Sequence, residues 1–493
     1  MHENAFLLGI DIGTSSLKCV IFNRKGEEVA TSHRTPALIR KSQNFSEISM
    51  EFLWEQVSSA IEEVVQKISP ENSGKIIAIG ISGTACGCWL LGSDMCPIRD
   101  AILWNDGRSA EIVGNWQKSG VLDEIFKISG NSIFPGYPVA VIRWLKENEP
   151  ESLKKAKYNI FCKDWIRYRL TGEIAVDHSD MGYFPYDICN RRISEEILGA
   201  CKIEEFGRLI PRIIEPGTTA GFLKDDLARK FNLHKSIPVI AGLVDVAAAT
   251  LGGGAHKIGQ ACSVLGTSFL NTLVCETPSF KPFGLGVQTS TVGTSFIRSM
   301  VNTSGTINLQ WFLDNFCEQE QDSMLMEDSS IYEWAENTAA DIPIGSCGII
   351  YHPYINTTGV VSPFVNPAAR AQFFGVSINH SKAHFLRSIY EGTALAMLDC
   401  YENIPENIQQ VFLSGGGARS DFWCQILADC TGKEIILTSG SELGAKGVAL
   451  LAGCAGGLYQ DIEQAAVEVF RINKTFYPDS KNHQEFLELY NLY

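Results

Sequence analysis

Residues 236–255 read SIPVIAGLVDVAAATLGGGA, with one carboxylate, Asp245, between an apolar run and a run of small residues. The β-branched run 237–244 predicts a buried strand, and the alanine-rich segment after Asp245 predicts a helix. Open α/β sheets bind their ligands at the carboxyl ends of their strands, which is where this arrangement would place Asp245. The alternative is that Asp245 only caps the following helix by accepting backbone N–H bonds. The rest of the chain favours a role in a site.

The composition is that of a globular chain of two or three domains. Its 493 residues exceed the size of a single core, and 45% of them are hydrophobic. The net charge of −15 disfavours a nucleic acid or an anionic membrane as partner, because phosphate binding requires a basic surface. No run reaches the roughly 18 apolar residues of a membrane span, and the N-terminal segment lacks the basic region of a signal peptide. The 15 cysteines are scattered without zinc spacing, so we expect a reduced, cytoplasmic protein.

Strands and helices alternate along the chain, which is typical of α/β architecture. The expected strands are a hairpin over 6–23, then 27–30, 76–81, a second hairpin over 260–275, 410–414 and 434–437. The expected helices are 54–68, about 109–130, 139–148, 160–170, 420–431, 447–457 and a helical tail within 460–493. The second hairpin repeats the pattern of the first, which predicts two related domains, 1–250 and 251–493.

The turn 11–16 (DIGTSS) of the first hairpin has the composition of a phosphate-binding loop. Gly13 lets the backbone approach a ligand, and the N–H groups and hydroxyls around Thr14 and Ser15 can cradle phosphate oxygens. Lys18 adds a positive charge, and Asp11 can hold Mg²⁺ through water. The alternative is a plain hairpin turn, because these residue types are common turn formers.

Two more turns extend this hypothesis. Residues 266–268 (GTS) repeat the first turn, and two such turns would clamp a nucleotide from both sides. Residues 414–418 (SGGGA) lie between a predicted strand and a predicted helix, where glycines would let an adenosine approach the backbone. Alternatively, these glycines serve only a tight strand–helix turn. The chain has no GxGxxG, Walker, HExxH or GxSxG motif, so dinucleotide folds, P-loop kinases, zincins and α/β-hydrolases are not favoured.

A tryptophan beside polar groups follows the apolar run 101–103. Trp104, Asn105 and Asp106 come in sequence, with Arg108 two residues on. Polar groups beside an aromatic face suit a polyhydroxylated ligand. The alternative is a surface turn with a buried tryptophan.

Together these segments resemble the FGGY family of carbohydrate kinases over nearly the whole chain. The turn 11–16 resembles the family's first phosphate motif, 265–268 its second and 414–418 its adenosine motif. Residues 371–391 (AQFFGVSINHSKAHFLRSIYE) fit the carboxy-terminal signature at every specified position. The resemblance implies two α/β domains of the ribonuclease-H type, as in actin, with the active site in the cleft between them. It also implies that the domains close after the sugar binds.

The resemblance implies ATP-dependent phosphorylation of a terminal hydroxyl of a small ketose or polyol, with Asp245 as the catalytic base. ATP and Mg²⁺ are the implied cofactors, with Asp11 and Asp245 holding the ion through water, and a homodimer is expected. The implied nucleotide-binding residues are Asp11, Gly13, Thr14, Ser15, Lys18, Gly266, Thr267, Gly305, Gly415, Gly416, Gly417 and Ala418. The implied substrate-binding residues are Thr84, Ala85, Cys86, Trp104, Asn105, Asp106 and Asp245.

The chain departs from the family pattern at positions that bear on the substrate. Glycerol kinases have an Arg-Glu pair where this chain has Ala85 and Cys86, so glycerol is not expected. Val141 replaces a signature lysine, and Asp245 is followed by Val246. These two features look more like L-xylulose or 3-keto-gulonate kinases, whereas residues 104–106 are similar to D-xylulose kinases. Alternatives are a tetritol or pentitol kinase, an actin- or chaperone-like ATPase, and a catalytically inactive sugar sensor, which the retained Asp11 and Asp245 disfavour.

Overall fold

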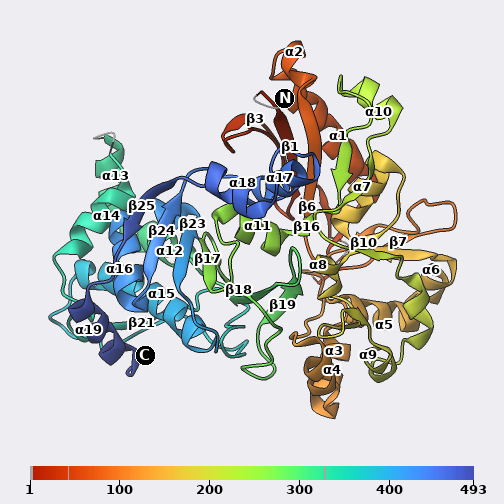
Figure 1. The fold of residues 1–493 in the computed structure, drawn as a ribbon. Helices are drawn as coiled ribbons and strands as arrows, with labels where there is room; N and C mark the ends of the chain where they lie inside the picture. Colours follow the sequence, from red (N-terminus) through yellow and green to blue (C-terminus); the bar gives the residue numbers. More distant parts are fainter. Residues whose placement is uncertain (1–3, 41, 43, 327–328) are drawn as a thin grey trace. The chain divides into compact units, whose positions relative to one another are not determined.

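The protein is described from a computed structural model, which covers residues 4–40, 42, 44–326 and 329–493. The chain divides into two compact units (Figure 1). Unit 1 runs to His256 and also contains Cys275–Arg298 and Glu442–Phe470. Unit 2 contains Lys257–Val274, Ser299–Ser441 and Arg471–Tyr493. The predicted mixture of strands and helices is confirmed, but the units do not follow a single cut near residue 250.

Unit 1 is built on one large mixed sheet. Its strand order is β14-β15-β6-β1-β2-β3, and β16 also pairs with β6. The elements of unit 1 are β1 (Phe6–Ile12), β2 (Leu17–Asn23), β3 (Glu28–Arg34), β4 (Leu38–Ile39), β5 (Glu47–Ile48), α1 (Met50–Gln66), α2 (Pro70–Ser73), β6 (Ile76–Gly83), β7 (Trp89–Leu91), β8 (Ala101–Ile102), α3 (Ala110–Ser119), α4 (Val121–Ser129), α5 (Pro138–Asn148), α6 (Pro150–Lys155), β9 (Tyr158–Ile160), α7 (Cys162–Thr171), β10 (Val176–Asp177), α8 (His178–Met181), β11 (Tyr186–Asp187), β12 (Arg192–Ile193), α9 (Glu195–Ala200), η1 (Glu204–Leu209), β13 (Ile213–Ile214), β14 (Thr219–Phe222), α10 (Asp225–Lys230), β15 (Pro238–Ile240), β16 (Leu243–Val244), α11 (Asp245–Gly253), β19 (Val287–Ser290), α17 (Leu443–Ala455) and α18 (Ile462–Val469).

The centre of this sheet is the predicted hairpin β1–β2 with β6 beside it. β1 pairs antiparallel with β2 and parallel with β6, so Asp11 lies between Lys18 and Ser82. Helix α1 packs on one face, where its apolar side chains recur at helical spacing. Helix α17, drawn in blue among the red strands of Figure 1, packs on the other face. It comes very close to the strands, because a Cβ on Gly9 or Gly80 would lie 2.1 Å from a backbone oxygen of α17.

The second large sheet has the strand order β19-β20-β18-β17-β23-β24-β25, and its strands from β18 to β25 in this order lie almost wholly in unit 2. The predicted hairpin β17–β18 is confirmed, and β23 and β24 extend the sheet in parallel. The elements of unit 2 are β17 (Gln260–Leu265), β18 (Phe269–Cys275), β20 (Phe296–Asn302), α12 (Ile307–Phe316), α13 (Glu318–Met326), α14 (Ile331–Ala340), η2 (Ser346–Gly348), β21 (Ile350–His352), β22 (Gln372–Phe374), α15 (Lys382–Glu402), β23 (Gln410–Ser414), η3 (Gly416–Arg419), α16 (Asp421–Thr431), β24 (Glu434–Thr438), β25 (Ile472–Phe476) and α19 (Ser480–Tyr490).

Several predicted elements differ in the structure. The single strand over 237–244 is two strands, β15 and β16, interrupted at residues 241–242, and Gly242 packs so closely on β6 that a Cβ would lie 1.5 Å from the Ile81 oxygen. The helix over 109–130 is two helices, since Gly120 adopts a left-handed conformation with φ 83°. The helical tail is wrong in part: α18 belongs to unit 1, and β25 pairs with β24.

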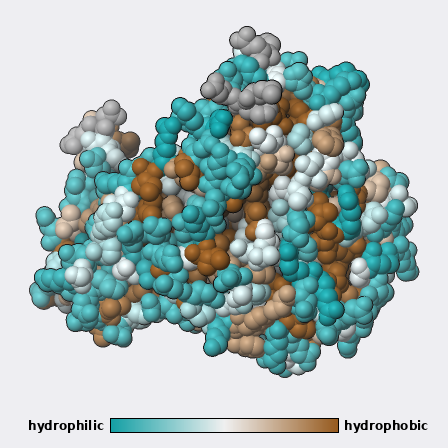
Figure 2. Space-filling view, viewed as in Figure 1, coloured by the Kyte–Doolittle hydropathy of each residue, from teal (hydrophilic) through white to brown (hydrophobic). Residues whose placement is uncertain are grey.

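The face drawn in Figure 2 is covered mostly by hydrophilic residues, with apolar residues in smaller patches between them. Within the described part of the chain, none of the helices is both long enough and apolar enough to cross a membrane.

Candidate active site

Asp245 lies where a strand of the large sheet in unit 1 meets a helix. β16 pairs with the end of β6, with Val244 opposite Gly83, and α11 begins at Asp245 itself. The capping position is therefore Val244, and the Asp245 carboxylate accepts a hydrogen bond from the adjacent Val246 N–H at 2.8 Å. Asp245 is the first residue of α11 rather than its N-cap, so a capping role accounts for this one hydrogen bond but not for the burial of the carboxylate beside Asp11.

The carboxylates of Asp11 and Asp245, both in unit 1, lie close enough to interact electrostatically. Burial raises the pKa of Asp245 to about 7, the negative charge of Asp11 adds to the rise, and the Val246 N–H partly offsets it. Burial also raises the pKa of Asp11, against the lowering effects of Ser82 and Lys18. The structure therefore brings together the two acidic residues that the sequence assigned to catalysis and metal binding.

The first turn of α17 packs directly on Asp11. A Cβ on Gly444 would lie 2.5 Å from the Asp11 carboxylate, so only glycine fits at this position. Glu442, just before the helix, forms an ion pair with Lys18 at 2.5 Å. Lys18 is thus partly neutralised, which weakens the expectation that its whole charge acts on a phosphate. Sequence reasoning missed Glu442 and Gly444, because no local pattern relates them to the first hairpin.

The first phosphate turn is joined to the tryptophan of the predicted sugar segment. Gly13 N–H donates to the Ser16 oxygen at 2.9 Å and closes the turn. Trp104 Nε1 donates to Thr14 Oγ1 at 2.7 Å, while Ser15 is exposed. Trp104 keeps 44% of its surface exposed, so it is not the buried tryptophan of the alternative interpretation.

The segment after β6 continues toward the same carboxylates. Thr84 N–H donates to the Ile12 oxygen at 2.9 Å, and Ala85 is half-buried. Cys86 adopts a positive φ of 64° and is fully enclosed. Burial raises the pKa of the Cys86 thiol well above its ordinary value, and the charges of Asp245 and Asp180 raise it further. Cys86 is therefore a neutral thiol close to Asp245.

Two tyrosines that sequence reasoning did not single out complete this side of the site. The rings of Tyr137 and Tyr183 lie 6.1 Å apart, and Tyr137 Oη donates to the Gly182 oxygen at 2.6 Å. Burial raises the pKa of Tyr183 well above its ordinary value, as do Cys86 and Asp245. Both phenols stay protonated, and that of Tyr183 is a neutral group close to Asp245.

The Asp106 side chain, predicted to contact the sugar, forms hydrogen bonds with other residues of the protein. Its carboxylate is fully buried and accepts hydrogen bonds from Arg108 Nε at 2.7 Å, Arg108 Nη2 at 2.8 Å and Ser46 N–H at 2.6 Å. Both oxygens are occupied by these donors, so Asp106 supports the segment rather than a ligand. Asn105, its neighbour, is exposed.

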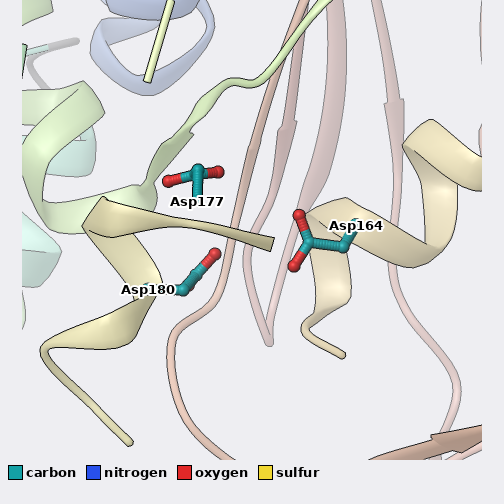
Figure 3. A group of neighbouring side chains, drawn as sticks. All are labelled: Asp164, Asp177 and Asp180. Atoms are coloured by element: carbon teal, nitrogen blue, oxygen red, sulfur yellow. The ribbon is translucent and has the colours of Figure 1, made fainter. Parts of the chain in front are cut away.

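A second group of carboxylates lies deeper in unit 1. Oxygens of Asp164, Asp177 and Asp180 lie within 4.8 Å of one another and face a common space (Figure 3). This geometry alone would suit a metal ion. The Lys163 ammonium group forms ion pairs with all three carboxylates, and Arg167 pairs with Asp164, so basic side chains supply the positive charge of this group.

In unit 2, the predicted second phosphate turn packs against Gly305. Gly305 N–H donates to the Thr267 oxygen and Thr306 N–H to the Gly266 oxygen, both at 2.7 Å. A Cβ on Gly305 would lie 2.4 Å from the Gly266 oxygen. Helix α12 begins directly after Thr306, so its N-terminus lies beside the turn, an arrangement that favours anions.

The predicted adenosine turn lies on the end of β17, next to the second phosphate turn. A Cβ on Gly415 would lie 2.4 Å from the Leu265 oxygen, and one on Gly417 would lie 2.3 Å from the Leu265 side chain. These two glycines are thus required by packing. Gly416 is exposed, and a Cβ added there would meet nothing within 4 Å. Ala418 N–H donates to the Gly415 oxygen at 3.2 Å.

Comparison with known proteins decides the family. The N-terminal domain model of the FGGY family of carbohydrate kinases matches residues 6–252, and the C-terminal domain model matches residues 261–456. The chain belongs to the FGGY family of carbohydrate kinases. The kinase uses ATP to phosphorylate a small sugar or polyol, and this membership rules out the actin- or chaperone-like ATPase alternative.

Curated relatives and solved structures match the kinase along almost its whole length. It is 29% identical to the xylulose kinase of Bacillus subtilis, across 99% of this chain and 96% of the relative. It is 26% identical to the L-xylulose/3-keto-L-gulonate kinase of Escherichia coli, again across 99% and 96%. The ligand-bound xylulose kinase from Lactobacillus acidophilus is similar with a TM-score of 0.90 at 24% identity, covering 99% of this chain and 97% of that one. The predicted two-domain, actin-type fold is confirmed.

Proposed function

We propose that this kinase transfers the γ-phosphoryl group of ATP to a terminal hydroxyl of a pentulose, with Asp245 as the base. The observation that supports this role is the position of Asp245 beside Asp11 at the end of β16, with its pKa raised to about 7. A group that accepts a proton in the transition state works best when its pKa lies near the working pH.

The residues around Asp245 have separate roles in orienting the carboxylate and in binding the phosphates and the sugar. The Val246 N–H holds one carboxylate oxygen at 2.8 Å and so fixes the orientation of the side chain. A sugar hydroxyl is a far weaker acid than Asp245, so the carboxylate orients the hydroxyl and accepts its proton late, as the oxygen attacks phosphorus. The N–H groups and hydroxyls of Thr14 and Ser15 would bind phosphate oxygens, and Trp104 would form an apolar wall for the sugar.

The residues present fit Mg²⁺. Asp11 Oδ1 is buried and has no hydrogen-bond partner among the described residues. The neighbouring Asp245 carboxylate repels it, and a cation relieves this repulsion. We assign Asp11 and Asp245 as the residues that hold the ion through water, as Mg²⁺ prefers. Bound Mg²⁺ neutralises negative charge on the phosphates.

In unit 2, Gly266 and Thr267, supported by Gly305, would bind phosphate oxygens near the N-terminus of α12. Gly416 and Ala418 would border the adenosine, on a turn that Gly415 and Gly417 allow to pack against β17. These roles rest on the clustering of the predicted residues within this unit and on the preference of helix N-termini for anions.

A pentulose is favoured by the names of the two relatives, a xylulose kinase and an L-xylulose/3-keto-L-gulonate kinase. The neutral groups of Cys86 and Tyr183 near Asp245, with the Tyr137 ring 6.1 Å from that of Tyr183, suit uncharged hydroxyls. The stereochemistry is decided by assay of D- and L-xylulose beside erythritol, ribitol and glycerol. Preference for a tetritol or a pentitol over both xyluloses would contradict the pentulose proposal.

We also propose a cytoplasmic homodimer. The family resemblance is the reason for the dimer, and light scattering of the purified protein tests it. The 15 cysteines are thiols rather than disulfides, which suits a reducing compartment.

The role of Asp245 is tested with Asp245→Asn, which keeps the shape but removes the basic group. We expect kcat to fall about a thousandfold or more, because general-base and positioning effects together are of that size. The Kd of ADP, measured by calorimetry, should stay within about twofold, since only transition-state interactions are lost. The matched control is Asp123→Asn, an exposed residue in the first turn of α4, which should keep normal turnover. Near-normal turnover of Asp245→Asn would show that another group is the base.

A further inference from the structure

A buried ion-pair group lies behind the site in unit 1. It consists of Lys163 and Arg167 on α7 with Asp164, Asp177 and Asp180, and each side chain is at most 1% exposed. Although burial alone would lower the pKa of Lys163, the three carboxylates together raise it. The lysine is therefore charged and holds carboxylates from α7 and from the β10–α8 segment around one centre (Figure 3).

One carboxylate of this group is connected to the strand that carries the catalytic residue. Asp177 Oδ1 accepts hydrogen bonds from Ser179 N–H at 3.0 Å and from Ser179 Oγ at 2.5 Å. Ser179 Oγ accepts in turn from Val244 N–H at 2.9 Å. Val244 immediately precedes Asp245, so the chain of contacts runs from the lysine to the backbone that bears the carboxylate.

The same lysine residue packs on the strand that leads to the sugar segment. A Cβ on Gly83 would lie 2.9 Å from Lys163 N and 3.1 Å from Lys163 Cβ. Gly83 also pairs with Val244 across β6 and β16. The ends of both strands are thus held by one buried group, just before Thr84 on one strand and Asp245 on the other.

We propose that Lys163, Asp177 and Ser179 are positioning residues that fix Asp245 relative to the sugar-binding segment 84–86. The proposal rests on the role of Asp245 given above. Positioning matters because a misplacement of about 1 Å lowers a rate about a hundredfold. The contacts described above reach Asp245 through the backbone of Val244, so their loss should affect the chemical step more than nucleotide binding.

Ser179→Ala tests this role, because it removes the acceptor for Val244 N–H and leaves the ion pairs in place. We expect kcat to fall about tenfold or more, while KM for ATP stays within about twofold. Ser179→Thr keeps the hydroxyl and should retain kcat within about threefold of the wild type, although it adds a buried methyl group. If Ser179 served only to fill space, Ser179→Thr should have the lower kcat of the two variants. The larger threonine side chain is the more disruptive one in a fully buried position.

The matched control is Ser194→Ala. Ser194 is 2% exposed, and its Oγ accepts from Ile197 N–H at 3.1 Å and donates to the Glu196 carboxylate at 3.0 Å, the same connections that Ser179 makes. Ser194 caps α9 and takes no part in the site, so Ser194→Ala should keep kcat within about twofold while losing comparable stability. Thermal unfolding of each variant measures that stability.

Two outcomes separate this inference from the proposed function. If Asp245→Asn is inactive but Ser179→Ala matches Ser194→Ala in kcat, the positioning role is wrong and the role of Asp245 stands. If Asp245→Asn turns over normally, the proposed base is wrong instead. Should Ser179→Ala not fold, Asp177→Asn replaces it, and the same changes in kcat and in KM for ATP are expected. Asparagine keeps the oxygen that faces Ser179 but weakens the ion pair with Lys163.

Discussion

The carboxylate of Asp245 is placed where its ionised form is disfavoured, yet the ionised form is the one that accepts a proton. Burial and the charge of Asp11 raise its pKa to about 7. Desolvation of this kind is common where a carboxylate acts in catalysis, because it moves the pKa toward the working pH. Protonation of Asp245 would remove the proton acceptor that we propose, so activity should fall as the pH decreases through its pKa.

The pH profile of the kinase follows from this pKa. We expect kcat/KM for the sugar to fall about tenfold per pH unit below the pKa of about 7, because only the ionised fraction of Asp245 is active. A cation beside the carboxylate favours its ionised form, so raising the concentration of free Mg²⁺ should move this acid limb to lower pH. Initial rates between about pH 5 and about pH 9 at two Mg²⁺ concentrations measure both effects.

The control for the pH profile is the residual activity of Asp245→Asn, which should lack the acid limb. An unchanged limb in that variant would mean that another group titrates. Asp11 is the nearest candidate, since burial raises its pKa as well.

Among the elements, α17 combines structural and functional contacts. It is buried along most of its length, from Leu443 to Gly453. Its small residues let it lie on the glycines of β1 and β6, and its first turn meets Asp11 at Gly444. A helix far along the chain thus sets the position of a carboxylate on the first strand.

Substitution of Gly444 by alanine tests this contact. The added Cβ would lie 2.5 Å from the Asp11 carboxylate, so the carboxylate must move. We expect kcat to fall about a hundredfold, as for a displacement of about 1 Å. The unfolding midpoint should change little, because alanine favours a helix by about 0.5–1 kcal/mol over glycine and offsets part of the strain.

The matched control is Gly114→Ala in α3, where nothing lies within 4 Å of the added Cβ. This variant should gain about 0.5–1 kcal/mol in the free energy of unfolding and keep normal turnover. Equal activity of the two variants would show that Asp11 tolerates the shift.

Elements with a strong local pattern were predicted correctly from the sequence. The hairpin β1–β2, the strand β6 and the helix α16 follow from apolar periodicity and turn residues, whereas phosphate binding by the turns 11–16 and 266–268 remains a prediction. Tyr183 and Gly444 have no such signal, since each matters only through what the fold brings beside it. The internal hydrogen bonds of Asp106 have no such signal either: only the folded chain shows that Arg108 and Ser46 N–H donate to its carboxylate.

At the scale of the whole molecule, unit 1 includes two segments that come later in the sequence than its first 256 residues. Cys275–Arg298 and Glu442–Phe470 both belong to this unit. The second of these segments contains α17, which covers one face of the sheet. The first contains Thr289, whose hydroxyl donates to the Ser179 oxygen, and Gln288, whose N–H donates to the Asn131 side chain. A helix buried along most of its length cannot be removed without exposing the strands beneath it.

A fragment that ends at His256 should therefore fail to fold, although it spans the whole match to the N-terminal family model. The glycine face of β1 and β6 would be exposed, and the backbone of these strands has no side chains there to shield it. We expect the fragment to unfold in urea without a cooperative transition, followed by circular dichroism. Co-expression with the fragment that begins at Lys257 supplies both missing segments and should restore a cooperative transition and kinase activity. A cooperative transition of the first fragment alone would show that the sheet and its other helices suffice, and that α17 is needed for the position of Asp11 rather than for folding.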